Sequence, residues 1–184
     1  MLATMSSSPD TLIIGAGVMG AGIAQWVSAR GIPVILQDID ATRVAVGMKA
    51  VAKVYGGAVR RRLFSPAEAR HLADHISPAA TPVPLQDVDL VVEAAVERLD
   101  IKKKIFADMD EIAREGVILA TNTSSQSVTE IAAATKRPDK VIGMHFFNPV
   151  PVMRLIEIVR GIQTSDETYD IIFELSKALG KTPV

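Results

Sequence analysis

The sequence contains no cysteine, few aromatic residues and no marked excess of either charge. Without cysteine, the chain can form neither a disulfide nor a thiolate metal site. Its net charge is −1 over 184 residues, so it lacks the clustered basic excess that binds nucleic-acid phosphates. No apolar run approaches the ~20 residues of a membrane helix. We therefore expect neither nucleic acid nor a membrane as a partner.

The N-terminal stretch, MLATMSSSPDT, has neither the basic-then-apolar order of a secretion signal nor the arginines of a transit peptide. We expect residues 1–10 to be a flexible leader and the protein to be cytoplasmic. The remaining chain is long enough, and at 48% hydrophobic residues apolar enough, for one large α/β domain with a full core.

A strand–helix–strand pattern opens the ordered part of the chain. The apolar run TLIIGAG is followed by small residues at helical spacing and then by a second apolar run, PVILQDID. Gly31 is the predicted end of the helix between them. This succession is a βαβ unit, and such units build parallel sheets.

Residues 41–75 interrupt the alternation and predict two helices. Ser65 and Glu68 have the spacing of a capping box for the second helix, with Pro66 at its first position. The segment GGAVRRR between them is predicted to be a loop with three consecutive arginines. We interpret residues 41–75 as an inserted helical hairpin.

Strand and helix patterns alternate again after residue 75. The predicted strands are VDLVVEAA, GVILATNTSS, KVIGMHFF and VMRLIEIVRG, and the predicted helices are RLDIKKKIFADMDEIARE, SVTEIAAAT and SDETYDIIFELSKALG. A turn over residues 148–152 would make the last two strands antiparallel neighbours.

The run GAGVMG has the G-x-G-x-x-G spacing, directly after a strand and at the start of a helix. Gly15 permits a tight turn, Gly17 lets a pyrophosphate approach the backbone, and Gly20 lets the helix pack closely on the strand. The phosphates would bind N–H groups at the positive end of the helix, beside Val18 and Met19. Met19 also has the helical position of a core residue, which is the alternative interpretation.

Asp38 lies at the end of the second strand, 23 residues beyond Gly15. A carboxylate there accepts hydrogen bonds from an adenosine ribose and repels a 2′-phosphate, so it indicates NAD rather than NADP. The alternatives are a flavin, or a glycine-rich turn followed by an acidic helix cap. The predicted fold class is α/β: a Rossmann-like, doubly wound, mostly parallel sheet with an inserted helical hairpin and an antiparallel extension on its C-terminal side.

The run GMHFFNPVPVM delivers His145 to a turn at the end of a strand, beside two phenylalanines. In a doubly wound sheet this end faces the ligand crevice. Glu157 stands twelve residues later in an otherwise apolar strand, where an unpaired charge is costly. Antiparallel pairing would place it opposite His145, and such a carboxylate orients an imidazole and raises its basicity. The pair is thus a candidate general base; the alternative is a semi-buried histidine in an aromatic core.

Five segments, GAGVMGAGIA, VVEAAVERLDIK, ATNTSS, GMHFFNPVPVMRLIEIV and SKALGK, resemble the L-3-hydroxyacyl-CoA dehydrogenase family in order and spacing. The resemblance runs from about residue 12 to residue 184. It implies a Rossmann domain that binds NAD, with an acyl-CoA as substrate. It also implies the oxidation of L-3-hydroxyacyl-CoA to 3-ketoacyl-CoA, or the reverse, in fatty-acid degradation, short-chain synthesis or aromatic-acid degradation.

The resemblance assigns roles to individual positions. His145 would be the base that takes the hydroxyl proton, and Glu157 the carboxylate that orients it. Ser124 would bind the substrate oxygen, and Asn148 the substrate or the nicotinamide. Three further residues would lie at the ribose and amide side of the cofactor: Glu97, Lys102 and Asn122.

The family also implies features outside the nucleotide site. Its hairpin contacts CoA, and Arg60 and Arg61 suit phosphate capture, although a solvated charged loop is an equal alternative. Its members have a second, helical domain that completes the site and forms a homodimer. That domain would begin about where this sequence ends, so we expect the chain alone to be inactive or weakly active. Alternatives are a hydroxyacid dehydrogenase that does not use CoA, and a non-enzymatic module that senses NAD or CoA.

The segment HLADH places His71 and His75 one helical turn apart with an acid between them. No third ligand is evident, and histidines on a helix face are commonly structural. We predict no metal site.

Overall fold

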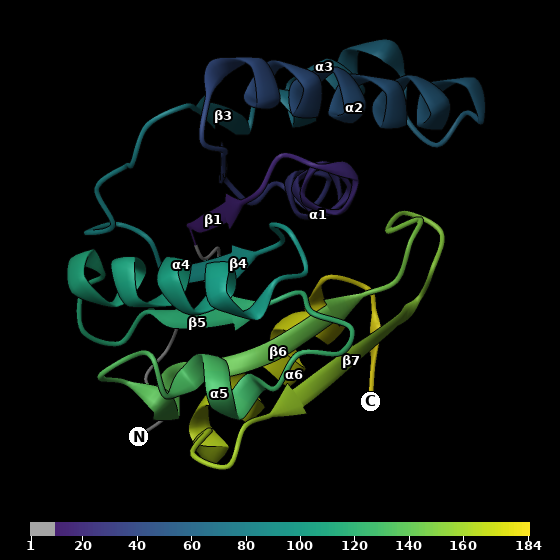
Figure 1. Cartoon of the computed structure of the whole chain (residues 1–184). Coiled ribbons are helices and arrows are strands. Elements are labelled where there is room, and N and C mark those ends of the chain that lie inside the picture. Colours follow the sequence, from purple (N-terminus) through teal and green to yellow (C-terminus); the bar gives the residue numbers. More distant parts are fainter. Residues whose placement is uncertain (1–9) are drawn as a thin grey trace.

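The computed structural model describes residues 10–184, in which fifteen elements form one α/β unit (Figure 1). The predicted leader lies almost wholly outside the described residues. The strands are β1 (Thr11–Ile14), β2 (Val34–Gln37), β3 (Ile76–Ala79), β4 (Leu90–Glu93), β5 (Ile118–Thr121), β6 (Val141–Phe146), β7 (Leu155–Arg160) and β8 (Thr182–Pro183). The helices are α1 (Val18–Ser28), α2 (Ala41–Arg60), α3 (Pro66–Ala73), α4 (Leu99–Ile112), α5 (Val128–Ala132), the 3-10 turn η1 (Pro138–Lys140) and α6 (Asp166–Ala178).

The strands make one sheet in the order β3-β2-β1-β4-β5-β6-β7-β8. All neighbouring pairs from β3 to β6 are parallel, β6 and β7 are antiparallel, and β8 is parallel to β7. The order reverses between β1 and β4, as in doubly wound sheets. The predicted fold class is confirmed, including the antiparallel extension.

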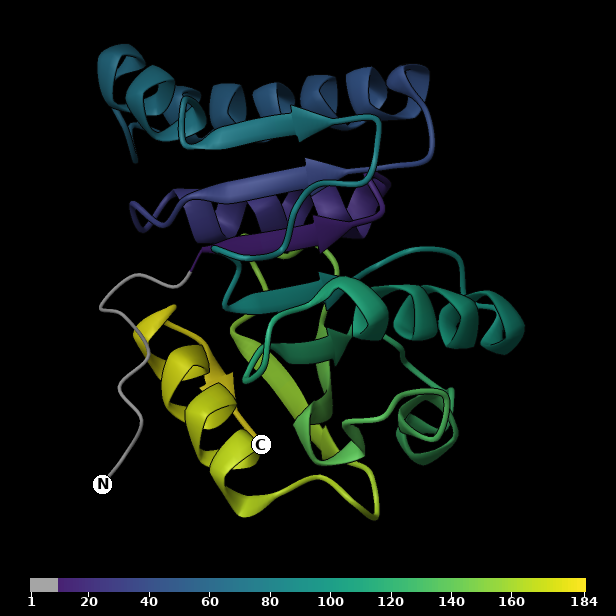
Figure 2. The ribbon, with the colours of Figure 1, turned by 90° about the vertical axis from the view of Figure 1, so that its left-hand side faces the viewer.

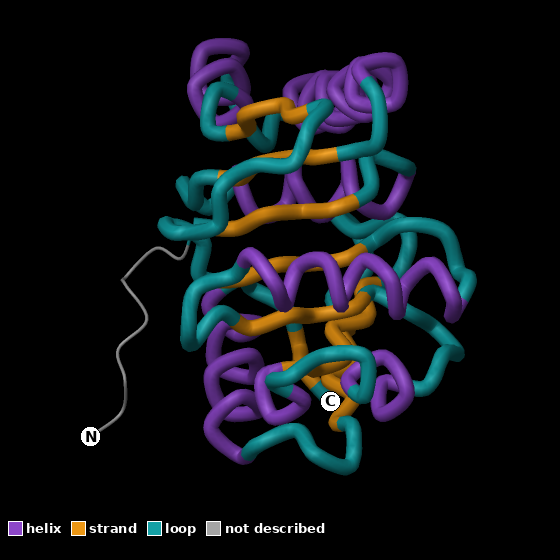
Figure 3. Tube along the Cα trace, turned by 60° about the vertical axis from the view of Figure 1, so that its left-hand side comes forward, coloured by secondary structure: helices purple, strands orange, loops and turns teal. Residues whose placement is uncertain are grey.

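Alternating side chains on the buried strands supply two cores, one on each face. In β1, Ile13 joins the core formed with α1, α2 and α6, whereas Leu12 and Ile14 join the core formed with α4 and α5. Helices therefore cover both sides of the sheet (Figure 3). Because both faces are covered, the central strands β1, β4 and β5 are buried along their whole length rather than on alternate residues.

The predicted loop GGAVRRR is wrong, because α2 continues through this glycine-rich segment to Arg60. Val51, Tyr55 and Ala58 are buried on one face of the helix. A glycine costs a helix only ~1 kcal/mol, and burial of this face overcomes that cost. The capping box at Ser65 and Glu68 is confirmed, with both reciprocal hydrogen bonds formed.

The helical segment 41–75 is the crossover between two neighbouring parallel strands, β2 and β3. The pattern analysis missed β3 because its four residues, ISPA, include a proline and only one buried side chain. Pro78 is tolerated because β3 is an edge strand. Figure 2 shows α2 starting beyond the arrowhead of β2 and running back along it. Within residues 10–184, no helix is both long and apolar enough to cross a membrane.

Candidate active site

The glycine turn joins β1 to α1 and leaves the start of the helix open. Gly15 has a φ of +102°, and a Cβ there would lie 2.7 Å from the carbonyl oxygen of Ala94. A Cβ on Gly20 would lie 1.7 Å from the carbonyl oxygen of Gly15, so only glycine lets the helix pack this closely. At Gly17 a Cβ would meet nothing within 4 Å, and no side chain caps the helix. Unpaired N–H groups facing open space make an anion site.

Asp38 follows β2 and lies against the same turn. Its Oδ2 accepts a hydrogen bond of 2.7 Å from the backbone N–H of Ala16, and its Oδ1 accepts one of 2.7 Å from Ile39. The carboxylate is therefore fixed beside the anion site, where the ribose of a bound dinucleotide would lie. The turn, the open helix start and the carboxylate together fit NAD.

Replacing Asp38 by alanine should relax the preference for NAD over NADP. The change removes the ribose acceptor and the charge that repels a 2′-phosphate, so the affinity for NAD should fall while that for NADP rises. Calorimetric titration of both dinucleotides checks this. Asp40→Ala is the matched control, because it removes a nearby carboxylate whose side chain caps α2 and does not contact the glycine turn. Equal affinity of the unaltered chain for both would contradict the role of Asp38.

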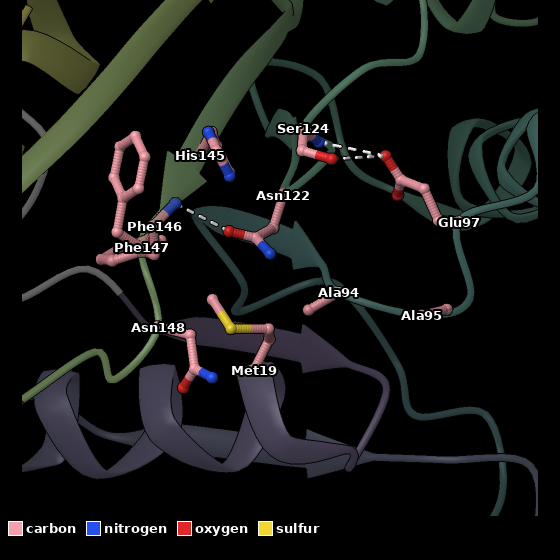
Figure 4. A pocket seen from close by; sticks show the side chains of 10 residues that line it. All are labelled: Met19, Ala94, Ala95, Glu97, Asn122, Ser124, His145, Phe146, Phe147 and Asn148. Atoms are coloured by element: carbon pink, nitrogen blue, oxygen red, sulfur yellow. Dashed lines mark hydrogen bonds between the residues drawn. The ribbon is translucent and has the colours of Figure 1, made fainter.

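A pocket of about 300 Å³ opens at the carboxyl edge of the sheet, where β4, β5 and β6 end beside the first turn of α1. Figure 4 shows its lining, which comprises Met19, Ala94, Ala95, Glu97, Asn122, Ser124, His145, Phe146, Phe147 and Asn148. Six of these are predicted site residues, drawn from four separate segments of the chain. Met19 also packs against the core, as its alternative interpretation states, and its contact with the cofactor stays a prediction.

His145 and Glu157 face each other across the antiparallel pair, as predicted. They are register partners in β6 and β7, and His145 Nδ1 lies 2.7 Å from Glu157 Oε2. An ionised carboxylate only accepts hydrogen bonds, so it assigns a proton to Nδ1 and leaves Nε2 as the basic nitrogen. The His145 side chain is 16% exposed and lines the pocket. Its ring also contacts that of Phe147 in a tilted arrangement, with the two ring centroids 4.6 Å apart.

Asn122 and Ser124 follow β5 and stand at the opposite wall of the pocket. Asn122 Oδ1 accepts a 2.8 Å hydrogen bond from the Phe146 N–H, which fixes the side-chain amide and leaves its NH₂ group for a ligand. The backbone N–H of Ser124 donates to Glu97 Oε1 at 3.0 Å, and its hydroxyl lies 3.5 Å from the same oxygen. Figure 4 shows this pair beside Asn122.

Lys102 lies behind the pocket wall and not in the pocket. Its side chain is 0% exposed, and Nζ donates to both carboxylate oxygens of Glu93 at 2.9 Å. The same ammonium lies 3.2 Å from Glu97 Oε2. The resemblance predicts Lys102 at the cofactor; in this structure its Nζ holds the carboxylates of Glu93 and Glu97, and a contact with a bound cofactor stays a prediction.

The hydrogen bonds around Glu97 keep it ionised. Burial acts to raise the pKa of Glu97, but the Thr123 hydroxyl and the Lys102 ammonium more than offset burial and hold that pKa below its ordinary value. The sequence interpretation identified neither Thr123 nor Glu93. For Glu93, no local sequence pattern indicates that a strand residue pairs with a helix residue nine positions later. Phe146 and Phe147 were noted only as part of the run GMHFFNPVPVM, without a place in the pocket lining.

Arg60 and Arg61 do not reach the pocket. The helix α2 begins at the carboxyl edge and is 20 residues long, which is about 30 Å, so both arginines lie at its far end.

The remaining predicted positions lie outside the pocket. Val18 is at the start of α1 and largely exposed. The rings of His71, on α3, and His75, just beyond its end, meet edge to face at 5.2 Å. No group of three or more possible metal ligands gathers within residues 10–184.

Comparison with known proteins gives one consistent answer. Residues 11–184 match the family described as the NAD-binding domain of 3-hydroxyacyl-CoA dehydrogenase. A 3-hydroxybutyryl-CoA dehydrogenase of Clostridioides difficile is 45% identical over 172 residues, which is 94% of this chain and 61% of that protein. The fatty acid oxidation complex subunit alpha of Acinetobacter baylyi is 39% identical over 94% of this chain and 24% of its own length.

Solved structures agree with the sequence relatives. The crystal structure of (S)-3-hydroxybutyryl-CoA dehydrogenase from Ralstonia eutropha superposes with a TM-score of 0.93 at 43% identity, covering 97% of this chain and 63% of that one. The chain thus spans less than two thirds of these relatives. It belongs to the 3-hydroxyacyl-CoA dehydrogenase family, as its NAD-binding domain, and its cofactor is NAD.

Proposed function

We propose that this domain carries the catalytic base of an NAD-dependent 3-hydroxyacyl-CoA dehydrogenase, which oxidises L-3-hydroxyacyl-CoA to 3-ketoacyl-CoA or runs the reverse reduction. The observation that supports this most is the His145–Glu157 pair, at 2.7 Å, on the wall of a pocket beside the dinucleotide turn. A domain that only senses NAD has no use for an oriented imidazole at this place.

In the oxidation, Nε2 of His145 accepts the proton of the substrate hydroxyl. Glu157 holds the Nδ1 proton and stabilises the imidazolium that forms. Bound NAD would supply the hydride acceptor for the carbon that carries that hydroxyl. In the reduction, the imidazolium returns its proton to the carbonyl oxygen, so one pair of residues serves both directions.

The opposite wall orients the substrate and the cofactor. We assign Ser124 to the substrate oxygen, because Glu97 fixes its backbone N–H and its hydroxyl lies in the pocket. Asn122 and Asn148 present side-chain amides to the same space. Arg60 and Arg61 would take part only if CoA extends along α2, and we propose them for its phosphates on charge alone.

The acyl chain and the homodimer contacts would belong to the second, helical domain that the resemblance implies, and the relatives are longer than the matched region. The part of the pocket that this domain forms would hold a substrate loosely. Correct positioning of the reactants is worth roughly 7–11 kcal/mol of the activation barrier. We therefore expect residues 1–184 alone to turn over acyl-CoA slowly, and a chimera with the unmatched part of the Clostridioides difficile relative to be active.

The chimera also tests the substrate class. It should form NADH from NAD and L-3-hydroxybutyryl-CoA, and much less from free L-3-hydroxybutyrate. Equal rates with the free acid would identify a hydroxyacid dehydrogenase without CoA. NAD binding with no turnover of either compound would favour a sensing module. Comparable rates for residues 1–184 and the chimera would place every catalytic group within this domain.

A further inference from the structure

Lys181, which follows α6 and precedes β8, is a buried cation with no carboxylate as a partner among residues 10–184. It is 5% exposed, and within the described residues the one charged group that shifts its pKa is another cation, Arg30. Its Nζ donates to the carbonyl oxygens of Val150 at 2.5 Å and Met153 at 2.8 Å. Burying an ammonium without an anion is costly, so these contacts must offset a substantial desolvation penalty.

The aromatic ring of Trp26 in α1 provides the rest of the cation's surroundings. Lys181 Nζ lies 3.8 Å from the ring centroid, and the Arg30 guanidinium lies 3.3 Å from the same centroid. Two groups this close must occupy opposite faces, since on one face they would overlap. Trp26 Nε1 donates to the Leu179 carbonyl at 3.0 Å, which holds the ring in place. Cation–π contact of this kind stabilises a desolvated ammonium.

The two carbonyls that Lys181 binds belong to the connection between β6 and β7, residues 147–154. Val150 is 2% exposed and packs on α1, where a Cβ added to Gly22 would lie 3.1 Å from its Cγ2. The N–H groups of Val152 and Met153 donate to Pro149 at 2.9 and 3.0 Å. The connection therefore lies between the cofactor helix and the Lys181 ammonium.

Phe147 and Asn148, at the start of this connection, line the pocket. We propose that Lys181 is a positioning residue of the active site, whose buried ammonium anchors the β6–β7 connection to α1 and so fixes Asn148 and Phe147 at the nicotinamide end of the pocket. This inference rests on the proposed function for the identity of the ligand there. The anchor itself rests on geometry alone.

A protonated amine suits this place better than an apolar side chain, because three N–H donors meet two carbonyls and a ring. Burial, with Arg30 as a second cause, lowers the pKa of Lys181 to about 8. The groups that face it are the Val150 and Met153 carbonyls, the Trp26 ring and, at 5.9 Å, the Phe146 ring. A released Lys181 would regain the higher pKa of a lysine in water and bind more protons than the anchored one, so the anchored state should be favoured as the pH rises above about 8. The neutral amine keeps two N–H donors for the two carbonyls.

The test is Lys181→Met, and the matched control is Lys177→Met. Lys177 is exposed on α6, where its ammonium forms an ion pair with Glu174. Two ligands separate the ends of the site: NADH fills both, whereas ADP-ribose lacks the nicotinamide. Lys181→Met should raise the dissociation constant of NADH about tenfold, the lower end of what a charge-assisted hydrogen bond contributes. The dissociation constant of ADP-ribose should stay unchanged, and Lys177→Met should alter neither.

Titration over pH adds a result that a general structural role would not give. The ratio of NADH to ADP-ribose affinity should rise above pH 8 in the unaltered chain and stay low and flat in Lys181→Met. Parallel losses of both ligands, or the same pH dependence in both proteins, would overturn the proposal.

Amide hydrogen exchange decides the question without any ligand. The amides of Val152 and Met153 should exchange faster in Lys181→Met, while those of β1 and β4 keep their protection and show that the sheet is folded. Unchanged exchange at these two amides would refute the anchor. If the unaltered chain bound neither ligand, the proposed function would fail, and exchange would still test the anchor.

Discussion

Replacing His145 by alanine should lower kcat of the chimera by about 10²–10⁴-fold, the range that loss of a general base produces. The affinity for NADH should change little, because the glycine turn and Asp38, which are expected to hold the pyrophosphate and the adenosine ribose, are unchanged. The measurements are steady-state rates with L-3-hydroxybutyryl-CoA and NAD, and a separate titration of NADH.

The matched control is His71→Ala, the same chemical change on the exposed face of α3. It should leave both kcat and NADH affinity as they are. A loss of less than about tenfold in His145→Ala would mean that the imidazole fills a semi-buried position and that the proton leaves by another route.

Replacing Lys102 by methionine should lower the free energy of unfolding by about 3–5 kcal/mol, the usual cost of removing one partner of a buried ion pair. Glu93 is 0% exposed and would keep only the Thr121 hydroxyl and the Ala95 N–H as partners. Denaturant unfolding of the chain measures this. A double change with Glu93→Gln should recover much of the loss, since no charge is then left buried.

Lys103→Met is the control for this change, one residue along the same helix. Its ion pair with Glu130 is 3.2 Å long and partly exposed on both sides, so it should contribute less than about 1 kcal/mol. Equal destabilisation by Lys102→Met and Lys103→Met would show that the buried cluster adds nothing beyond helix propensity.

The strongest sequence inference was the pairing of His145 with Glu157. A carboxylate in an apolar strand needs a partner, and a turn signal between two strands sets their register, so local chemistry and topology gave the same answer. The glycine turn was also predictable from the sequence, because two of its glycines meet steric requirements that the structure shows: a positive φ at Gly15 and a backbone contact at Gly20.

The errors came from tertiary contacts that outweigh local signals. Two glycines and three arginines predicted a loop, but burial of Tyr55 and Ala58 extends α2 through the glycines. The resemblance predicts Lys102 at the cofactor, but no local signal indicates that the packing of α4 against β4 encloses it beside Glu93. No role was predicted for Lys181, because a lysine after a helix is ordinarily solvated. Only the folded chain brings the β6–β7 connection over it.

A crystal structure of the chain with NAD bound tests the central claim most directly, namely that the carboxyl-edge pocket holds the nicotinamide beside an oriented base. We expect the pyrophosphate on the N–H groups at the start of α1 and the adenosine ribose hydroxyls within hydrogen-bond distance of Asp38. The nicotinamide should lie between Asn122 and Asn148, with Nε2 of His145 facing it across the space left for substrate. A nicotinamide outside this pocket, or a His145 turned away from Glu157 in the complex, would contradict the claim.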